Sequence, residues 1–224
     1  MTQARLLALA TALATSVAFA GPASAGLIFS DSFENPVNAQ NWQVYQSFGN
    51  WTASAGAGIE VQTSGTVSGV SAYDGNQYVE LDSDTDRGGV SAPTNSAMTR
   101  TMNLVAGSYE VVFQYLPRTS TENDNNIEVY VDGASQSLMT NMIGDVAGTR
   151  PPITDWQEVS FGFSVDGTDN LYGLTFGAAG QGNELGGFVD AVSVTKVPVP
   201  ATLAFLGLGL VGLGTVVRRR KIAV

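Results

Sequence analysis

The chain has 224 residues, with 10 cations, 20 acids and a hydrophobic content of 44%, and it contains neither cysteine nor histidine. A Ser-His-Asp triad, a cysteine nucleophile and a histidine-ligated zinc site are therefore excluded, and so are disulfides. Among hydrolytic mechanisms, the carboxylate-pair chemistry that glycosidases use remains open.

The first 25 residues have the pattern of a cleaved signal peptide. One cation precedes an uncharged apolar stretch, and the segment closes on an A-x-A pattern made by Ala23 and Ala25. Cleavage there makes Gly26 the first residue of the mature chain. An earlier cleavage site at residues 18–20 and a retained N-terminal membrane helix are the alternatives. We expect an exported protein.

The body, residues 26–196, is expected to be all-β. Apolar and polar residues alternate with a period of two in short stretches that end at Gly, Asn, Asp or Ser, and helical periodicity is hard to find. Strands are predicted at residues 58–62, 77–82, 109–115, 127–131, 159–165, 172–176 and 188–194, with exposed loops at 83–96, 119–126 and 142–154. Regular short strands of this kind favour a β-sandwich or jelly roll.

The body is far more acidic than the whole chain. The C-terminal segment holds four of the ten cations and the N-terminal segment one, so the body keeps five cations against all twenty acids, a net charge of about −15. Nucleic acid and anionic lipid need a Lys/Arg patch, so neither is an expected partner of this surface.

The C-terminal segment, residues 197–224, has three parts. A proline-containing break is followed by residues 201–217, an uncharged apolar run of 17 residues that as a helix covers roughly 25 Å, the short end of what spans a bilayer, so a single transmembrane helix is expected here. A basic cluster after it would remain on the cytoplasmic side of the membrane. The break is Val197, Pro198, Val199 and Pro200, and the basic cluster is Arg218, Arg219, Arg220 and Lys221.

This segment resembles a PEP-CTERM sorting signal of Gram-negative bacteria, although Val199 stands where the glutamate of that motif is usual. The resemblance implies recognition and cleavage by a membrane exosortase-type protease after an inner-membrane intermediate, and then release to the cell surface or extracellular matrix. A permanent stop-transfer anchor is the alternative.

The body is similar to galactose-binding-like jelly rolls, the fold of many carbohydrate-binding modules. Residues 31–36, 73–81 and 187–194 carry the likeness through their order and spacing. The resemblance implies non-catalytic polysaccharide binding. A structural, self-associating biofilm protein without a dedicated ligand is the alternative, and ice or mineral adhesion is less favoured because the threonines are scattered.

Glu34 and Asp190 are the candidate metal ligands. Asp190 shares its strand parity with Val192 and Val194, which predicts a buried carboxylate that needs a partner. The resemblance implies that the first and last strands lie together and that the two carboxylates hold a structural Ca²⁺. A hydrogen bond from Asp190 to a backbone N–H is the alternative. The alternating acids at residues 82–86 are interpreted as a solvated loop.

A ligand-binding face is predicted from Tyr130, Glu128, Gln114 and Glu110. Tyr130 has the opposite parity to the apolar residues of its strand and would lie beside Glu128, with the other two as hydrogen-bond partners. The three tryptophans are further stacking candidates, for each of which a core position is favoured. Nothing in the sequence resembles a glycosidase signature, so we expect no catalytic activity.

Overall fold

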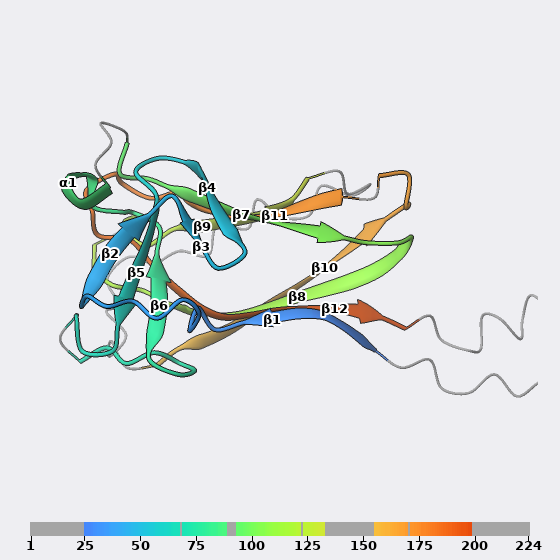
Figure 1. Ribbon diagram of the computed structural model, residues 1–224, viewed down its shortest axis with the longest axis horizontal. Helices are drawn as coiled ribbons and strands as arrows, with labels where there is room; N and C mark the ends of the chain where they lie inside the picture. The colour runs from blue at the N-terminus through green and yellow to red at the C-terminus, as the bar shows by residue number, and fades with distance from the viewer. Residues whose placement is uncertain are drawn as a thin grey trace, which may run out of the picture. The chain divides into compact units, whose positions relative to one another are not determined.

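Two antiparallel β-sheets packed face to face form the body of the protein (Figure 1). The computed structural model describes residues 25–198 except 68, 89–92, 122, 133–154 and 170. The predicted signal peptide before Ala25, the apolar run 201–217, the basic cluster and the loop 142–154 lie outside the described residues. Residues 25–198 form one compact unit.

The larger sheet, sheet A, has seven strands, and the smaller sheet B has five. Sheet A runs in the order β10 (Gln157–Val165), β8 (Gly107–Leu116), β12 (Phe188–Val197), β6 (Gln77–Glu80), β5 (Ile59–Thr63) and β2 (Trp42–Tyr45), and β1 (Gly26–Asp31) also pairs with β12. Sheet B runs β3 (Ser47–Phe48), β4 (Trp51–Ala55), β7 (Ala97–Asn103), β11 (Leu171–Ala178) and β9 (Ile127–Val131). The short helix α1 (Thr85–Gly88) follows β6.

The core lies between the sheets because alternate residues of each strand point inward. Trp51 is its largest member and is 1% exposed. Its indole contacts the rings of Phe29, Phe33 and Phe176 at centroid distances of 6.2, 5.9 and 5.7 Å. The prediction of an all-β sandwich is confirmed, and each of the seven predicted strands is present.

The strands that the sequence did not predict lie mainly in the first half of the chain. β2, β3 and β4 have two to five residues and no clear alternation of apolar and polar side chains, and β7 carries polar residues along much of its length. β1 begins at Gly26, directly after the predicted cleavage site.

The last strand, β12, pairs with the first strand, β1, and with two strands from the middle of the chain. β8 pairs with one edge of β12, while β6 and then β1 share the other edge, with Gly26 opposite Lys196. The expectation that the first and last strands lie together is confirmed. Within the described residues, no helix has the length and apolar character needed to cross a membrane.

Candidate functional site

Charged side chains are buried on the outer face of sheet A, the face turned away from sheet B. In β5, Ile59 and Val61 enter the core, so Glu60 and Gln62 point outward. Glu80 of β6 lies opposite Glu60 in the strand register. Glu60 is nevertheless only 4% exposed and Glu80 is completely buried. Full burial of carboxylates is uncommon unless they are paired.

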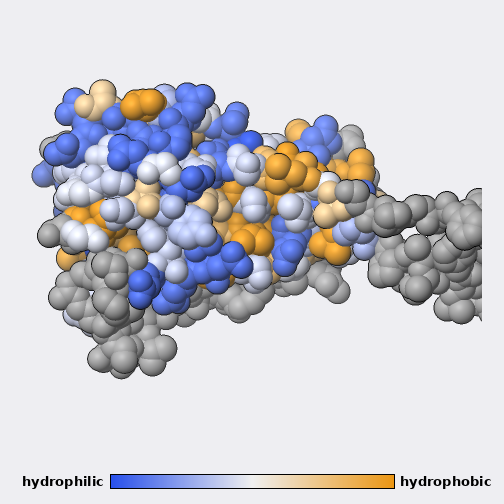
Figure 2. Space-filling view, turned by 90° about the horizontal axis from the view of Figure 1, so that it is seen from below, coloured by the Kyte–Doolittle hydropathy of each residue, from blue (hydrophilic) through white to orange (hydrophobic). Residues whose placement is uncertain are grey.

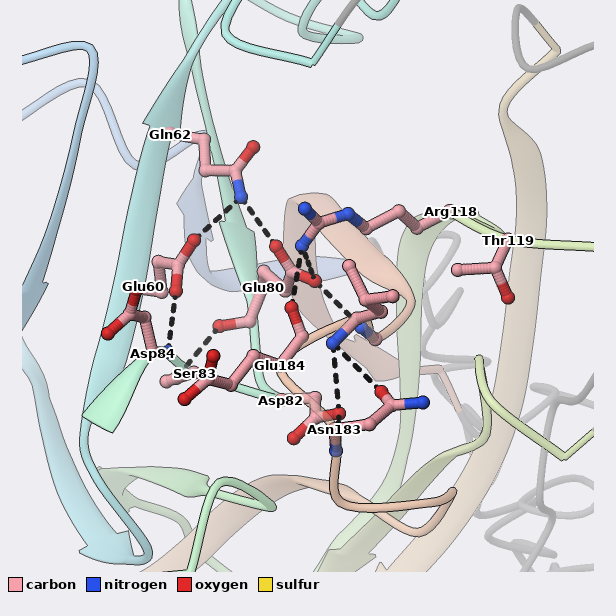
Figure 3. Close-up of polar contacts among 12 residues, drawn as sticks. Glu60, Gln62, Glu80, Asp82, Ser83, Asp84, Arg118, Thr119, Asn183 and Glu184 are labelled. Atoms are coloured by element: carbon pink, nitrogen blue, oxygen red, sulfur yellow. Dashed lines mark hydrogen bonds and ion pairs between the residues drawn. The ribbon is translucent and has the colours of Figure 1, made fainter. Parts of the chain in front are cut away.

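A hydrogen-bond network holds these side chains in place (Figure 3). The Gln62 amide donates to Glu60 Oε1 at 2.7 Å and to Glu80 Oε2 at 2.5 Å. Tyr78 donates its hydroxyl hydrogen to Gln62 Oε1 at 3.1 Å, which fixes the orientation of that amide. The Arg118 guanidinium lies 2.5 Å from Glu80 Oε1 as an ion pair. Arg118 is therefore the cation whose charge acts on both buried carboxylates.

The backbone supplies further donors to the same two carboxylates. The amide N–H of Gly186 donates to Glu80 Oε1 at 2.7 Å, and that of Asp84 donates to Glu60 Oε2 at 2.9 Å. The segment containing Gly186 is itself held by Asp82, whose Oδ2 accepts N–H groups from Asn183 and Leu185. The network thus fastens the β11–β12 connection to the outer face of sheet A at the end of β6.

Burial disfavours the charged form of both glutamates. Desolvation raises the pKa of Glu60, although hydrogen bonds from Asp84 and Gln62 oppose it. Desolvation and the charge of Glu60 raise the pKa of Glu80 well above its usual range, against the pull of Arg118. Such shifts concentrate at functional sites.

Beside this network is a hollow of about 360 Å³, which we call the outer pocket. It offers carboxylate and amide acceptors, guanidinium and amide donors, and one indole from β2. Its walls are formed by Trp42, Glu60, Gln62, Thr66, Val67, Asp84, Arg118, Asn183, Glu184 and Leu185. This combination can bind a polar ligand that has hydroxyl groups on its edges and an apolar face.

The three tryptophans have different positions. Trp51 is in the core, as favoured for each of them from the sequence. Trp156 is half-buried and donates to the Ser71 carbonyl at 2.9 Å, beside a small apolar cluster that includes Tyr78 and Phe188. Trp42 lines the outer pocket. Of the three, Trp42 is the one placed to contact a pocket ligand.

Asp190 departs from its predicted orientation. The β8–β12 register shifts between Asp190 and Ser193, and Ala191 has a φ of 48°. This bulge changes the parity, so Val192 and Val194 are in the core while Asp190 lies on the outer face opposite Gln114. Asp190 is still fully buried, as predicted.

Glu34 and Asp190 both bind the loop that precedes β6. Asp190 accepts the N–H groups of Tyr73 and Asp74 at 2.8 and 3.1 Å, and that of Ala191. Glu34 Oε1 accepts the N–H groups of residues 76 and 77 at 2.8 and 2.6 Å. Burial raises the pKa of Asp190 to about 7 although these amides lower it.

The surroundings of these two carboxylates do not fit a calcium ion. Calcium takes six to eight oxygen ligands, whereas Asp190 and Glu34 are met by five amide hydrogens. In the described part of the chain, no three acidic side chains are grouped so that they could hold a metal. The geometry corresponds to the alternative in which Asp190 binds backbone N–H groups.

The predicted ligand face is divided between the two sheets. Tyr130 and Glu128 are on β9 of sheet B, with Val129 between them in the core. Gln114 and Glu110 are on β8 and point outward from sheet A, and Gln114 is buried opposite Asp190. The four residues therefore do not form one surface, because parity gives the face of a strand but not the sheet to which it belongs.

The acidic stretch at residues 82–86 is only partly the solvated loop that the sequence suggested. Asp86 is exposed, whereas Asp82 is 1% exposed and holds the segment 183–185. Asp84 is half-buried and lines the outer pocket. Asp82 thus belongs to the hydrogen-bond network, Asp84 to the outer pocket, and Asp86 to the solvent-exposed surface.

Trp42 was a stacking candidate from the sequence and Asp84 was assigned to a solvated loop, but the other residues of the outer pocket were not predicted, although two features of the sequence indicate them. The pattern Ile59-Glu60-Val61-Gln62 puts two polar residues on one face of a predicted strand. Arg118 is one of only five cations in a body that has twenty acids, which favours an ion pair with one of them.

The C-terminal segment matches a protein-family model over residues 196–221, and the model is that of the PEP-CTERM protein-sorting motif. The chain carries a PEP-CTERM sorting motif. This motif confirms the predicted resemblance and implies export. Its first two residues, Lys196 and Val197, are also the last two of β12, so the PEP-CTERM motif begins inside the folded body.

The body is similar to several solved structures. The Stig cyclase Fisc from Fischerella sp. TAU superposes with a TM-score of 0.52 at 14% identity, covering 79% of this chain and all of that one. A xylan-binding domain from carbohydrate-binding module family 22 has a TM-score of 0.45 at 15% identity, covering 78% and 98%. TmCBM61 in complex with β-1,4-galactotriose has a TM-score of 0.43 at 16% identity, covering 66% and 88%. No curated protein sequence matches the chain significantly.

Proposed function

We propose that this exported protein is a carbohydrate-binding jelly roll that binds polysaccharide in the outer pocket without changing it chemically. The observation that carries the proposal is that Trp42 lines the same pocket as Glu60, Gln62 and Arg118. Sugar hydroxyls both donate and accept hydrogen bonds, and the C–H face of a sugar ring packs on an indole. The pocket supplies partners of each kind.

The rigidity of the pocket supports binding. Glu60 and Gln62 are fixed by hydrogen bonds to each other and to Asp84 and Tyr78 before any ligand arrives. Polar side chains that are already oriented lose little entropy when a ligand binds. Buried charge is unfavourable for folding, so its concentration at a pocket is better explained by a ligand than by stability.

The charge of the pocket indicates which polysaccharide fits. Three carboxylates, Glu60, Asp84 and Glu184, line the walls with a single guanidinium, that of Arg118. A chain of uronic acids would be repelled by this set and by the acidic body around it. We therefore propose a neutral polysaccharide as the ligand class.

The test is a glycan array probed with the full mature chain in a detergent that has no sugar headgroup. Binding to neutral oligosaccharides that persists in high salt, and that Trp42→Ala abolishes, is the expected result. Binding to no glycan, including exopolysaccharide prepared from the source organism, would overturn the proposal. So would binding to uronic-acid polymers alone.

Acid catalysis is a second candidate, and one observation favours it. Glu60 lines the pocket and burial raises its pKa, which are properties of a proton-donating carboxylic acid. Mass spectrometry of the bound oligosaccharide after long incubation separates the two functions. An unchanged ligand supports binding alone, whereas cleavage or rearrangement that Glu60→Gln prevents would establish catalysis.

We also propose that the sorting motif is processed by an exosortase-type protease and that the mature body reaches the cell surface or matrix. Intact-mass measurement of the surface-associated protein should show a chain that lacks residues 201–224. A chain that keeps its C-terminus would show a permanent anchor instead. A structural, self-associating role remains the alternative to glycan binding, and sedimentation of the mature chain without ligand would reveal it.

A further inference from the structure

Exposed apolar side chains concentrate at one end of the sandwich. Leu171 is 65% exposed, and Leu27 and Val105 are each 63% exposed. Nine large apolar residues in the described part of the chain are exposed, by 37% to 79%, and five of them belong to the same end. They are Leu27, Ile28, Val105, Leu171 and Val197.

The strand registers place these residues at the same end of both sheets. Leu27 is opposite Thr195 in β1 and β12, two residues before Val197, which itself is opposite Ser108 at the start of β8. Leu171 is opposite Asn103 at the end of β7, and Val105 lies in the short connection from β7 to β8. All of these positions are at the end where β12 finishes. We call this set the apolar end.

The same end is visible in the surface. Figure 2 shows hydrophobic residues, in orange, gathered over the half of the body where the strands converge on the end of β12, while the other end is mostly hydrophilic. The turn from β10 to β11 also lies here, because the position of a Cβ on Gly167 would be only 2.8 Å from the Ala106 nitrogen. Exposed apolar residues that gather at one place on a protein commonly mark an interaction site.

The covalent structure of the chain indicates what covers this end. β12 ends at Val197, and the apolar run predicted to enter the membrane begins at Ala201. Four residues can extend about 14 Å at most. While the tag is uncleaved, the apolar end is therefore tethered within that distance of the lipid surface.

We propose that the apolar end rests on the lipid bilayer while the sorting tag is intact, with Leu27, Val105, Leu171 and Val197 in its interfacial layer. The inference depends on the seating of residues 201–217 in the bilayer and is independent of glycan binding. The attraction is apolar, because the turn at this end carries exposed Asp166 and Asp169. A zwitterionic membrane is therefore sufficient.

This arrangement orients both functional parts of the protein. The Pro-x-Pro break directly follows β12, so docking holds it at the membrane surface, where a membrane protease works. The outer pocket lies beyond the opposite end of β12, a strand of ten residues that extends over about 30 Å. Its opening would then be held away from the membrane.

The test uses the full chain, which has no native cysteine and so accepts a single fluorescent label. Ala106→Cys places an NBD label in the β7–β8 connection, and Ala39→Cys places it at an exposed position in the other half of the body. Each protein is incorporated into phosphatidylcholine vesicles with and without doxyl-labelled lipid. We expect quenching at residue 106 to exceed that at residue 39 by roughly threefold or more, because interfacial docking buries apolar side chains about 5–10 Å into the boundary between headgroups and acyl chains.

A serine triple variant separates docking from tethering alone. Leu27→Ser, Val105→Ser and Leu171→Ser together should reduce quenching at residue 106 to the level at residue 39. Equal quenching of the two labels would overturn the proposal, and so would quenching that the serines leave unchanged. Failure of the chain to float with the vesicles would overturn it too. Energy transfer between labelled copies without lipid quenching would assign the apolar end to a second copy instead.

Discussion

The two ends of the sandwich depart from ordinary burial in opposite directions. At the end where β12 begins, Glu60 and Glu80 are buried, and Arg118 supplies the guanidinium that pairs with Glu80. At the end where β12 finishes, Leu27 and Leu171 are exposed to water. The buried glutamates lower the stability of the fold because their charge is desolvated, and the exposed leucines leave apolar surface in contact with water. Both are understandable if each end meets something outside the chain: a polar ligand at one, a lipid surface at the other.

The buried ion pair should have the largest effect on stability. Arg118→Met leaves Glu80 buried with no counter-charge, and breaking such a pair usually costs about 3–5 kcal/mol. Urea unfolding measures the loss. The double variant Glu80→Gln/Arg118→Met should recover most of it because neither charge remains. If the double variant is as unstable as the single one, the stabilising role belongs to packing of the Arg118 stem.

The carboxyl of Asp190 should make the protein more stable as the pH falls through the acidic range. Its pKa is about 7 in the folded protein against 3.8 ordinarily, so between those values the folded chain holds a proton that the unfolded chain has released. Its contribution to stability is therefore lost as pH rises towards 7, by up to about 4 kcal/mol.

The matched control for this effect is Asp190→Asn, which keeps an acceptor but does not titrate. The difference in unfolding free energy between wild type and variant should shift in favour of the wild type as the pH is lowered from 7 to 4. A difference that is constant over this window would show that Asp190 has no raised pKa.

Glu34 should have a smaller effect because it is half-buried and binds two amides. Glu34→Ala is expected to cost about 1–2 kcal/mol by leaving the N–H groups of residues 76 and 77 without their acceptor. Added CaCl₂ should not change the melting temperature of the wild type. A calcium-dependent rise that Glu34→Ala removes would restore the calcium interpretation.

The apolar end should have the smallest effect on stability. Leu171→Ala removes a side chain that is 65% exposed and should change the unfolding free energy by no more than about 0.5 kcal/mol. Leu174→Ala, on the same strand but fully buried, should cost about 2–5 kcal/mol. Similar losses for the two variants would mean that Leu171 supports the core.

The sequence was most informative where a local pattern decides the outcome. The strand predictions from the sequence located β5, β6 and every strand from β8 to β12, and the charge and proline pattern of the C-terminal segment identified the sorting motif. β3 has two residues and β4 five, and neither carries a pattern that distinguishes it from a loop.

Long-range pairing was not predictable. The side on which Glu110 and Glu128 lie follows from parity, but their assignment to different sheets follows from strand order. The β-bulge at Ala191 reverses the expected orientation of Asp190. The ion pair between Glu80 and Arg118 joins β6 to the segment after β8, and nothing local to either residue indicates the other.

Calorimetric titration of the best neutral oligosaccharide into two matched aromatic variants tests the central claim most directly. Trp42 lines the outer pocket, and Tyr130 is an exposed aromatic on sheet B. We predict that Trp42→Ala lowers the affinity by about tenfold or more, equivalent to about 1.4 kcal/mol, while Tyr130→Ala leaves it unchanged. Loss of binding in Tyr130→Ala with full binding in Trp42→Ala would contradict the account and move the ligand site to the opposite sheet.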